Sequence, residues 1–178
     1  MFDGLQAHES SVMAEREAIE QALAVRDLGA LRDLAFQPGG FGQDDGLRLR
    51  CWGFLVGVVD FESLPPLDVA TAAETSSHGD RSTVAKDVNR SLWAAGERRG
   101  WSEKVRNKRR RALARVVNAT FDESQHYYQG FHDVAAVTLD VAGFDPSGER
   151  RALAICRALA RRRLADACKR DFSDVSTS

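Results

Sequence analysis

Helix-forming periodicity runs through almost the whole chain, and this feature limits the fold more than any other. Residues 11–26, for example, are rich in alanine, glutamate, leucine and arginine, and their apolar positions fall near one face of an amphipathic helix. No segment shows the alternation of β-branched and polar residues between turns that indicates a strand. The sequence therefore predicts an all-α protein. The helices that we expect cover residues 11–26, 28–36, 46–58, 82–95, 102–119, 128–141 and 146–169.

Turn-forming residues separate these helices. Pro38, followed by two glycines, ends the second helix, and Asp44 or Asp45 is placed to cap the third. Asp145 followed by a proline is typical of a helix cap with proline in the first turn. Residues 60–80 contain a proline pair, several small polar residues and a glycine, so we expect them to form a connecting loop.

The composition is that of a soluble globular chain. Charged residues make up 29% of the 178 residues, and no apolar run approaches the roughly 18 residues that a membrane-spanning helix needs. The first residues lack the basic flank and the apolar core of a signal peptide. Cys51, Cys156 and Cys168 are widely spaced, which favours reduced thiols over disulfides. We therefore expect a cytoplasmic protein without a transmembrane segment.

One of the expected helices presents an arginine on its polar face. The apolar stripe of residues 82–95 starts at Val84 and recurs at the spacing of helical turns. At about 100° per residue, Arg90 lies roughly 150° around the helix from this stripe and is expected to be exposed. Asp87 precedes it by one turn on the same flank, where a carboxylate can hold the guanidinium in place. Such ion pairs are common on protein surfaces, so other residues must decide whether this one has a function.

Three sequence patterns, in the same order along the chain, resemble those of TBC-domain proteins, the GTPase-activating proteins of Rab GTPases. VAKDVNR, residues 84–90, is similar to the motif I-x-x-D-x-x-R, with valine in the first position. YYQG is similar to the motif Y-x-Q, which falls on Tyr127 and Gln129. Upstream, Arg48 and Trp52 resemble the arginine and the tryptophan near the start of such domains. The longer pattern HYYQGFHD resembles a subfamily whose longer members are anchored in the endoplasmic reticulum (ER).

The resemblance extends over about residues 28–172 and implies a fold and a domain division. The fold would be an irregular helical bundle that corresponds to the N-terminal lobe of a TBC-type helical domain. Residues 1–27 would be a helical extension, and residues 28–178 would be a partial domain whose second lobe is missing. Without that lobe, we expect apolar faces to be exposed and the chain to be prone to self-association.

The resemblance also implies roles for individual residues. Arg90 would be an arginine finger and Gln129 a glutamine finger, both supplied in trans to a Rab GTPase. The residues that would support these fingers and grip the GTPase are Asp87, Tyr127, Tyr128 and Gly130. Arg48 and Trp52 would be structural, with the tryptophan in the core and the arginine bridging helices.

These roles imply a regulator of another enzyme. The Rab GTPase would hold the GTP and the Mg²⁺, so the chain would need no cofactor of its own and would turn over no substrate itself. We expect it to act in the cytoplasm and at the periphery of ER or Golgi membranes. The alternative is a truncated module that binds a GTPase without accelerating hydrolysis.

The residues around the Y-x-Q motif also allow other interpretations. Gln129 could bond free backbone groups at a helix start, and the two tyrosines could be core aromatics. His126 and His132 are six residues apart, which does not align them on one helix face, so no metal site is predicted. Instead, His132 and Asp133 are expected to anchor the helix through hydrogen bonds.

A basic run in the second half of the chain is open to several interpretations. Residues 1–97 contain 16 acidic and 8 basic residues, a balance of −8, whereas residues 98–178 contain 10 and 17, a balance of +7. The simplest interpretation is a solvated helix face, and another is a surface that attracts an acidic endomembrane or an acidic patch of the GTPase. RNA binding is disfavoured, because no base-stacking motif accompanies the charges. The run holds Arg98, Arg99, Lys104, Arg106, Lys108, Arg109, Arg110, Arg111 and Arg115.

Overall fold

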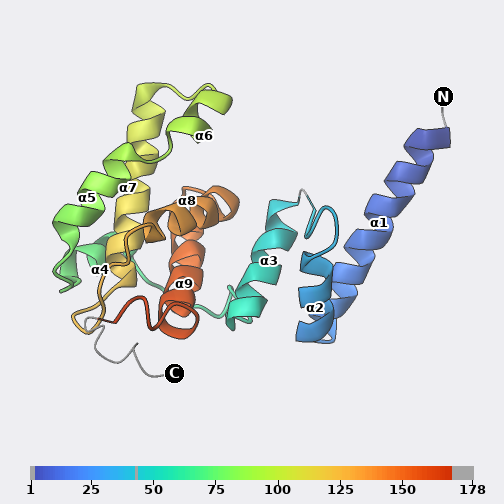
Figure 1. The fold of residues 1–178 in the computed structure, drawn as a ribbon, viewed down its shortest axis with the longest axis horizontal. Helices are drawn as coiled ribbons and strands as arrows, with labels where there is room; N and C mark the ends of the chain where they lie inside the picture. The colour runs from blue at the N-terminus through green and yellow to red at the C-terminus, as the bar shows by residue number, and fades with distance from the viewer. Residues whose placement is uncertain (1–2, 43, 170–178) are drawn as a thin grey trace. The chain divides into compact units, whose positions relative to one another are not determined.

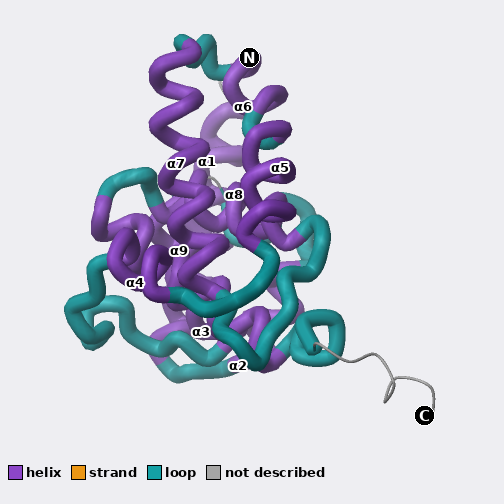
Figure 2. Tube along the Cα trace, turned by 90° about the vertical axis from the view of Figure 1, so that its left-hand side faces the viewer, coloured by secondary structure: helices purple, strands orange, loops and turns teal. Residues whose placement is uncertain are grey.

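All of the regular elements in the described part of the chain, residues 3–42 and 44–169, are helices. Figure 1 shows them in this computed structural model, coloured in chain order. In Figure 2 the described residues form helices and loops, and no strand is drawn among them. They are α1 (Asp3–Ala24), α2 (Leu28–Ala35), α3 (Asp45–Val56), α4 (Val69–Thr75), α5 (Arg81–Arg90), α6 (Trp93–Arg98), α7 (Glu103–Thr120), α8 (Phe131–Ala142) and α9 (Pro146–Arg162). The predicted all-α fold is confirmed. None of the helices in these ranges combines the length and the apolar character that crossing a membrane requires.

The chain divides into two compact units, and the first, Met1–Phe61, has a small core of its own. The Asp44 carboxylate caps α3 by accepting a hydrogen bond from the Leu47 amide at 2.9 Å, so of the two predicted caps Asp44 is the one used. The core residues of this unit come from all three of its helices and from the loop before α3. They are Ile19, Ala22, Leu31, Phe41, Leu47 and Cys51.

The predicted boundary between residues 27 and 28 stays a prediction. Within the first unit, Ile19 of α1 and Leu31 of α2 belong to the same core, so α1 packs against the helix that follows it. The division between the two compact units lies farther along the chain, after Phe61.

The second unit, Glu62–Ser178, is built around α7, which contacts α4, α5, α8 and α9. Leu113 and Val116 on the inner face of α7 are fully buried, and apolar burial of this kind is the main stabilising contribution in a domain of this size. Phe121 follows α7 and Phe131 begins α8, and their rings pack edge to face with centroids 5.0 Å apart. This contact holds the start of α8 against the end of α7.

The prediction of one continuous helix over residues 82–95 is wrong. Two helices cover this range, α5, which ends at Arg90, and α6, which begins at Trp93. Leu92 between them has a φ of +65°, in the left-handed region that interrupts a helix. Val84 and Val88 are buried, as the apolar stripe predicted, whereas Leu92 and Ala95, at and after the break, are only half-buried. Arg90 therefore lies at the end of a helix and not in its middle.

Two other differences lie near turns. The expected loop over residues 60–80 contains the short helix α4, whose first free amide is capped by the Asp68 carboxylate. The helix expected from Tyr128 begins three residues later, at Phe131. The reason is Gly130, whose φ of +103° is accessible to glycine at little cost and lies outside the helical region.

The last helix is shorter than predicted. α9 ends at Arg162, although helix-forming residues continue to Lys169. The segment turns instead and buries Cys168, whose carbonyl oxygen accepts a hydrogen bond from the His126 amide at 2.8 Å. A long-range backbone contact thus overrides local helix propensity at this end.

Candidate functional site

Arg90 is exposed and is held by a buried carboxylate. It is the last residue of α5, and its side chain is 72% exposed. Its guanidinium forms a hydrogen-bonded ion pair with Asp87, one turn earlier on the same helix. The predicted exposure of Arg90 and its pairing with Asp87 are both confirmed.

Asp87 differs from an ordinary surface partner because its side chain is only 2% exposed. A buried carboxylate is costly unless hydrogen bonds and opposite charge compensate for the lost water. Arg90 supplies the charge at one carboxylate oxygen, and the Tyr127 hydroxyl donates to the other at 2.9 Å. Burial alone would raise the pKa of Asp87, but the hydrogen bonds from Arg90 and Tyr127, together with the charges of His132 and Arg90, outweigh burial and hold that pKa below its usual value.

His132 extends this chain of hydrogen bonds from Tyr127. The Tyr127 hydroxyl donates its hydrogen bond to Asp87, so its oxygen is left to accept a second hydrogen bond. The Nδ1 atom of His132 lies 2.7 Å from that oxygen, which assigns the donor proton to Nδ1. Burial, followed by the nearby Asp87 carboxylate, raises the pKa of Tyr127 and keeps the phenol protonated. The hydrogen bond predicted for His132 is present, with Tyr127 as its partner, whereas the Asp133 side chain is 76% exposed and lies 3.4 Å from His132.

A second aspartate, Asp80, ties the same loop to the start of α5. Its carboxylate accepts a hydrogen bond from the Tyr127 amide at 2.9 Å and lies 2.9 Å from Nδ1 of His126. Asp80 precedes α5 but makes no side-chain cap on it, so its carboxylate serves the distant loop. An aspartate directly before a helix is typical of a cap, so the sequence alone does not indicate the contacts of Asp80 with the distant loop.

Gln129 and Tyr128 lie on the outer side of this anchored loop. Both are exposed, and the side chain of Tyr128 is 47% exposed. They stand between Tyr127, which is buried, and Gly130, which turns the chain into α8. Added side-chain atoms at Gly130 would meet nothing within 4 Å, so this glycine is needed for its backbone angle.

The structure thus connects Arg90 with the Gln129 loop through buried groups. Asp87 links the two segments, because it bonds Arg90 on its own helix and Tyr127 on the loop. Both predicted finger residues are exposed, while their predicted supports Asp87 and Tyr127 are buried. This arrangement can present a fixed cation and an amide to a partner molecule.

Arg48 and Trp52 belong to the other compact unit. Trp52 packs against the core of that unit, as predicted. Arg48 donates to the Asp45 carboxylate at 3.0 Å and to the Gly42 carbonyl. It therefore fastens the preceding loop to its own helix, which differs from the predicted bridge between helices.

The histidines near the Y-x-Q motif belong to separate contacts. His126 lies against Asp80, whereas His132 bonds Tyr127. In the part of the chain that the structure describes, no three or more His, Cys, Asp or Glu residues are grouped to hold a metal ion.

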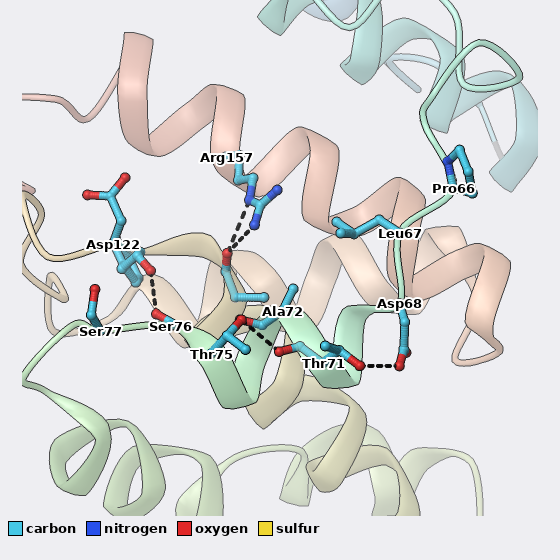
Figure 3. A pocket seen from close by; sticks show the side chains of 12 residues that line it. Pro66, Leu67, Asp68, Thr71, Ala72, Thr75, Ser76, Ser77, Asp122 and Arg157 are labelled. Carbon is cyan, nitrogen blue, oxygen red and sulfur yellow. Dashed lines mark hydrogen bonds between the residues drawn. The ribbon is translucent and has the colours of Figure 1, made fainter.

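A shallow pocket of about 500 Å³ lies elsewhere on the second unit (Figure 3). It is bordered by α4, by the loop after α7 and by Arg157 of α9. Arg157 donates two hydrogen bonds to the Ala119 carbonyl, and the Ser76 hydroxyl donates to the Phe121 carbonyl. None of the predicted site residues lines this pocket.

Tyr127→Phe tests the buried hydrogen bonds. We expect this variant to lower the free energy of unfolding by about 1–3 kcal/mol, because it removes the hydrogen-bond donor to one oxygen of the buried Asp87 carboxylate. Urea unfolding followed by circular dichroism measures the change. The matched control is Tyr128→Phe, which removes the same atom from an exposed ring and should change the unfolding free energy by less than about 0.5 kcal/mol. Equal effects would contradict the assignment.

Acid should weaken the fold partly through Asp87. Because its pKa is lower in the folded chain, the carboxylate contributes its full stabilisation above the unfolded pKa of about 3.9 and loses it as the pH falls through the folded value. The difference in unfolding free energy between the wild type and Asp87→Asn should therefore be largest near neutral pH and shrink below about pH 4. A difference that stays constant across this range would exclude an ionised Asp87.

The amino-acid sequence is similar to those of known proteins. No family model matches it. It is 32% identical over 150 residues to TBC1 domain family member 20 of Mus musculus, an alignment that covers 83% of this chain and 33% of that protein. The human and Bos taurus proteins of the same name are each 31% identical over 150 residues, with the same coverage. The chain spans about a third of the length of these relatives, and over the aligned residues it is homologous to TBC1 domain family member 20.

Proposed function

We propose that the chain accelerates GTP hydrolysis by a Rab-type small GTPase. Its relationship to TBC1 domain family member 20 supports this class of activity. The observation that carries the proposal is the exposed guanidinium of Arg90, fixed on a buried carboxylate that the Gln129 loop also bonds.

Arg90 is proposed to act as the arginine finger. In the transition state of GTP hydrolysis, negative charge is spread over the phosphate oxygens, and an arginine from a partner compensates for it. Such fingers are worth roughly 10³–10⁵ in rate. The planar fork of arginine matches phosphate oxygens better than a lysine ammonium, and its charge is permanent.

Gln129 is proposed to act on the attacking water. A carboxamide can accept a hydrogen bond from water with its oxygen and donate another with its nitrogen. Its exposure, next to the buried anchor Tyr127, leaves the amide accessible to a partner while the loop is held in place. Tyr128, also exposed, and the turn at Gly130 would contact the GTPase.

The partner supplies the remaining components. GTP and Mg²⁺ are bound by the GTPase, and the chain contributes side chains alone. We propose that the encounter takes place in the cytoplasm, at the periphery of ER or Golgi membranes.

Single-turnover hydrolysis with a panel of GTP-loaded Rab proteins tests the proposal. With the Rab protein that responds most strongly, Arg90→Ala should lower the stimulated rate by about 10³-fold or more. Gln129→Ala should lower it about 100-fold, the effect of losing one preorganised hydrogen bond in the transition state. Arg98→Ala, which removes an exposed arginine from α6, is the matched control and should leave the rate nearly unchanged.

The assay also separates the alternative function. If a Rab protein binds the chain but its hydrolysis rate is not stimulated, the chain is a GTPase-binding module without catalytic effect. A stimulated rate that Arg90→Ala leaves unchanged would show that Arg90 is not the finger.

A further inference from the structure

The helix that carries Arg90 ends at an unusual backbone turn. Leu92 has a φ of +65°, and among the described residues Arg26 is the only other non-glycine residue with a positive φ. Leucine rarely adopts this conformation, and neither glycine nor proline in residues 90–95 explains the break. Contacts from elsewhere in the fold must therefore hold the turn.

Arg110 of α7 supplies such a contact. Its Nε atom donates a hydrogen bond to the Ser91 carbonyl at 3.1 Å. In an uninterrupted helix that carbonyl would accept from the amide four residues later, at position 95. The Ser91 hydroxyl is turned back to the Asp87 carbonyl at 2.8 Å. Arg110 thus replaces a helical hydrogen bond at the residue that directly follows Arg90.

Trp93 seats the Arg110 side chain. The guanidinium carbon of Arg110 lies 5.1 Å from the centroid of the Trp93 ring, and that of Arg106 lies 4.1 Å from it. Arginine over a tryptophan face is attracted by the ring electrons. Gly96 lets Arg106 approach, because a Cβ at this position would lie 2.8 Å from its Nε. The two arginines and the ring hold the start of α6 against α7.

The basic run is therefore divided between two environments. Arg106, Arg109 and Arg110 are half-buried and lie over aromatic rings. Arg98, Arg99, Lys104, Lys108 and Arg111 are exposed, and Arg115 is paired with the Glu149 carboxylate. The prediction of a solvated helix face fits the exposed residues, so the half-buried arginines over the rings need a different explanation.

We propose that Arg110 is a positioning residue for Arg90: with Trp93, it fixes the turn that ends α5 and so fixes the direction in which the Arg90 side chain projects. This inference rests on the proposed GTPase-activating function. It implies that Arg110 affects the rate of hydrolysis and not the binding of the GTPase. Small displacements of a reacting group lower rates sharply, so a held helix end matters for a finger.

The test uses the full chain with the Rab protein that responds most strongly in the panel. Arg110→Met keeps an unbranched stem that can lie over Trp93 but removes the donor to Ser91. We expect it to lower kcat about tenfold, the rate equivalent of one lost positioning hydrogen bond, with KM for the GTP-loaded Rab protein unchanged. Arg111→Met removes the same charge from an exposed position and should leave kcat unchanged.

A double-mutant cycle shows whether the effect passes through Arg90. In the Arg90→Ala background, Arg110→Met should cause no further loss of rate. Trp93 is 52% exposed, so Trp93→Leu is a milder second variant. If Arg110→Met does not unfold cooperatively, Trp93→Leu takes its place and should also lower kcat.

Three results would overturn the inference. Equal effects of Arg110→Met and Arg111→Met on KM would assign the run to electrostatic capture. If Arg110→Met lowers kcat by the same factor in the Arg90→Ala background as in the wild type, Arg110 acts independently of Arg90. If Arg90→Ala itself has no effect, the proposed function fails, and this inference fails with it.

Discussion

The buried carboxylate of Asp87 is the interaction on which the candidate site depends. An unpaired charge with so little exposure would strongly destabilise the fold. Any movement that separates Asp87 from its partners is therefore unfavourable. One partner, Arg90, lies on the same helix, and the other, Tyr127, comes from a loop that is 40 residues away in the sequence. The buried carboxylate thus links the end of α5 to the loop that contains Tyr127.

The same principle extends outward from Asp87 to both sides. Toward the loop, His132 bonds the Tyr127 hydroxyl and Asp80 bonds its amide, so the exposed Gln129 lies two residues after an anchored tyrosine. Toward the helix end, the Ser91 hydroxyl bonds the Asp87 carbonyl. Buried polar groups therefore hold the two segments that expose Arg90 and Gln129.

Local periodicity was sufficient to predict most of the helices and the exposure of Arg90, because both depend on spacing within one segment, but it missed the short helix α4. It could not predict the break at Leu92, since leucine, tryptophan and alanine are compatible with a helix and the contact made there comes from Arg110, on another helix. The partners of Asp80 were equally hidden, because they come from residues 126–127. The turn at Gly130, by contrast, had a visible signal, a glycine between two polar clusters.

The most direct test of this account is the single-turnover rate of GTP hydrolysis with Asp87→Asn, in which Arg90 is kept and the charge that holds it is removed. The account predicts a folded variant that still binds the responsive Rab protein but whose stimulated rate falls about tenfold or more, because the guanidinium is no longer fixed. A wild-type rate from folded Asp87→Asn, under conditions in which Arg90→Ala is impaired, would contradict it.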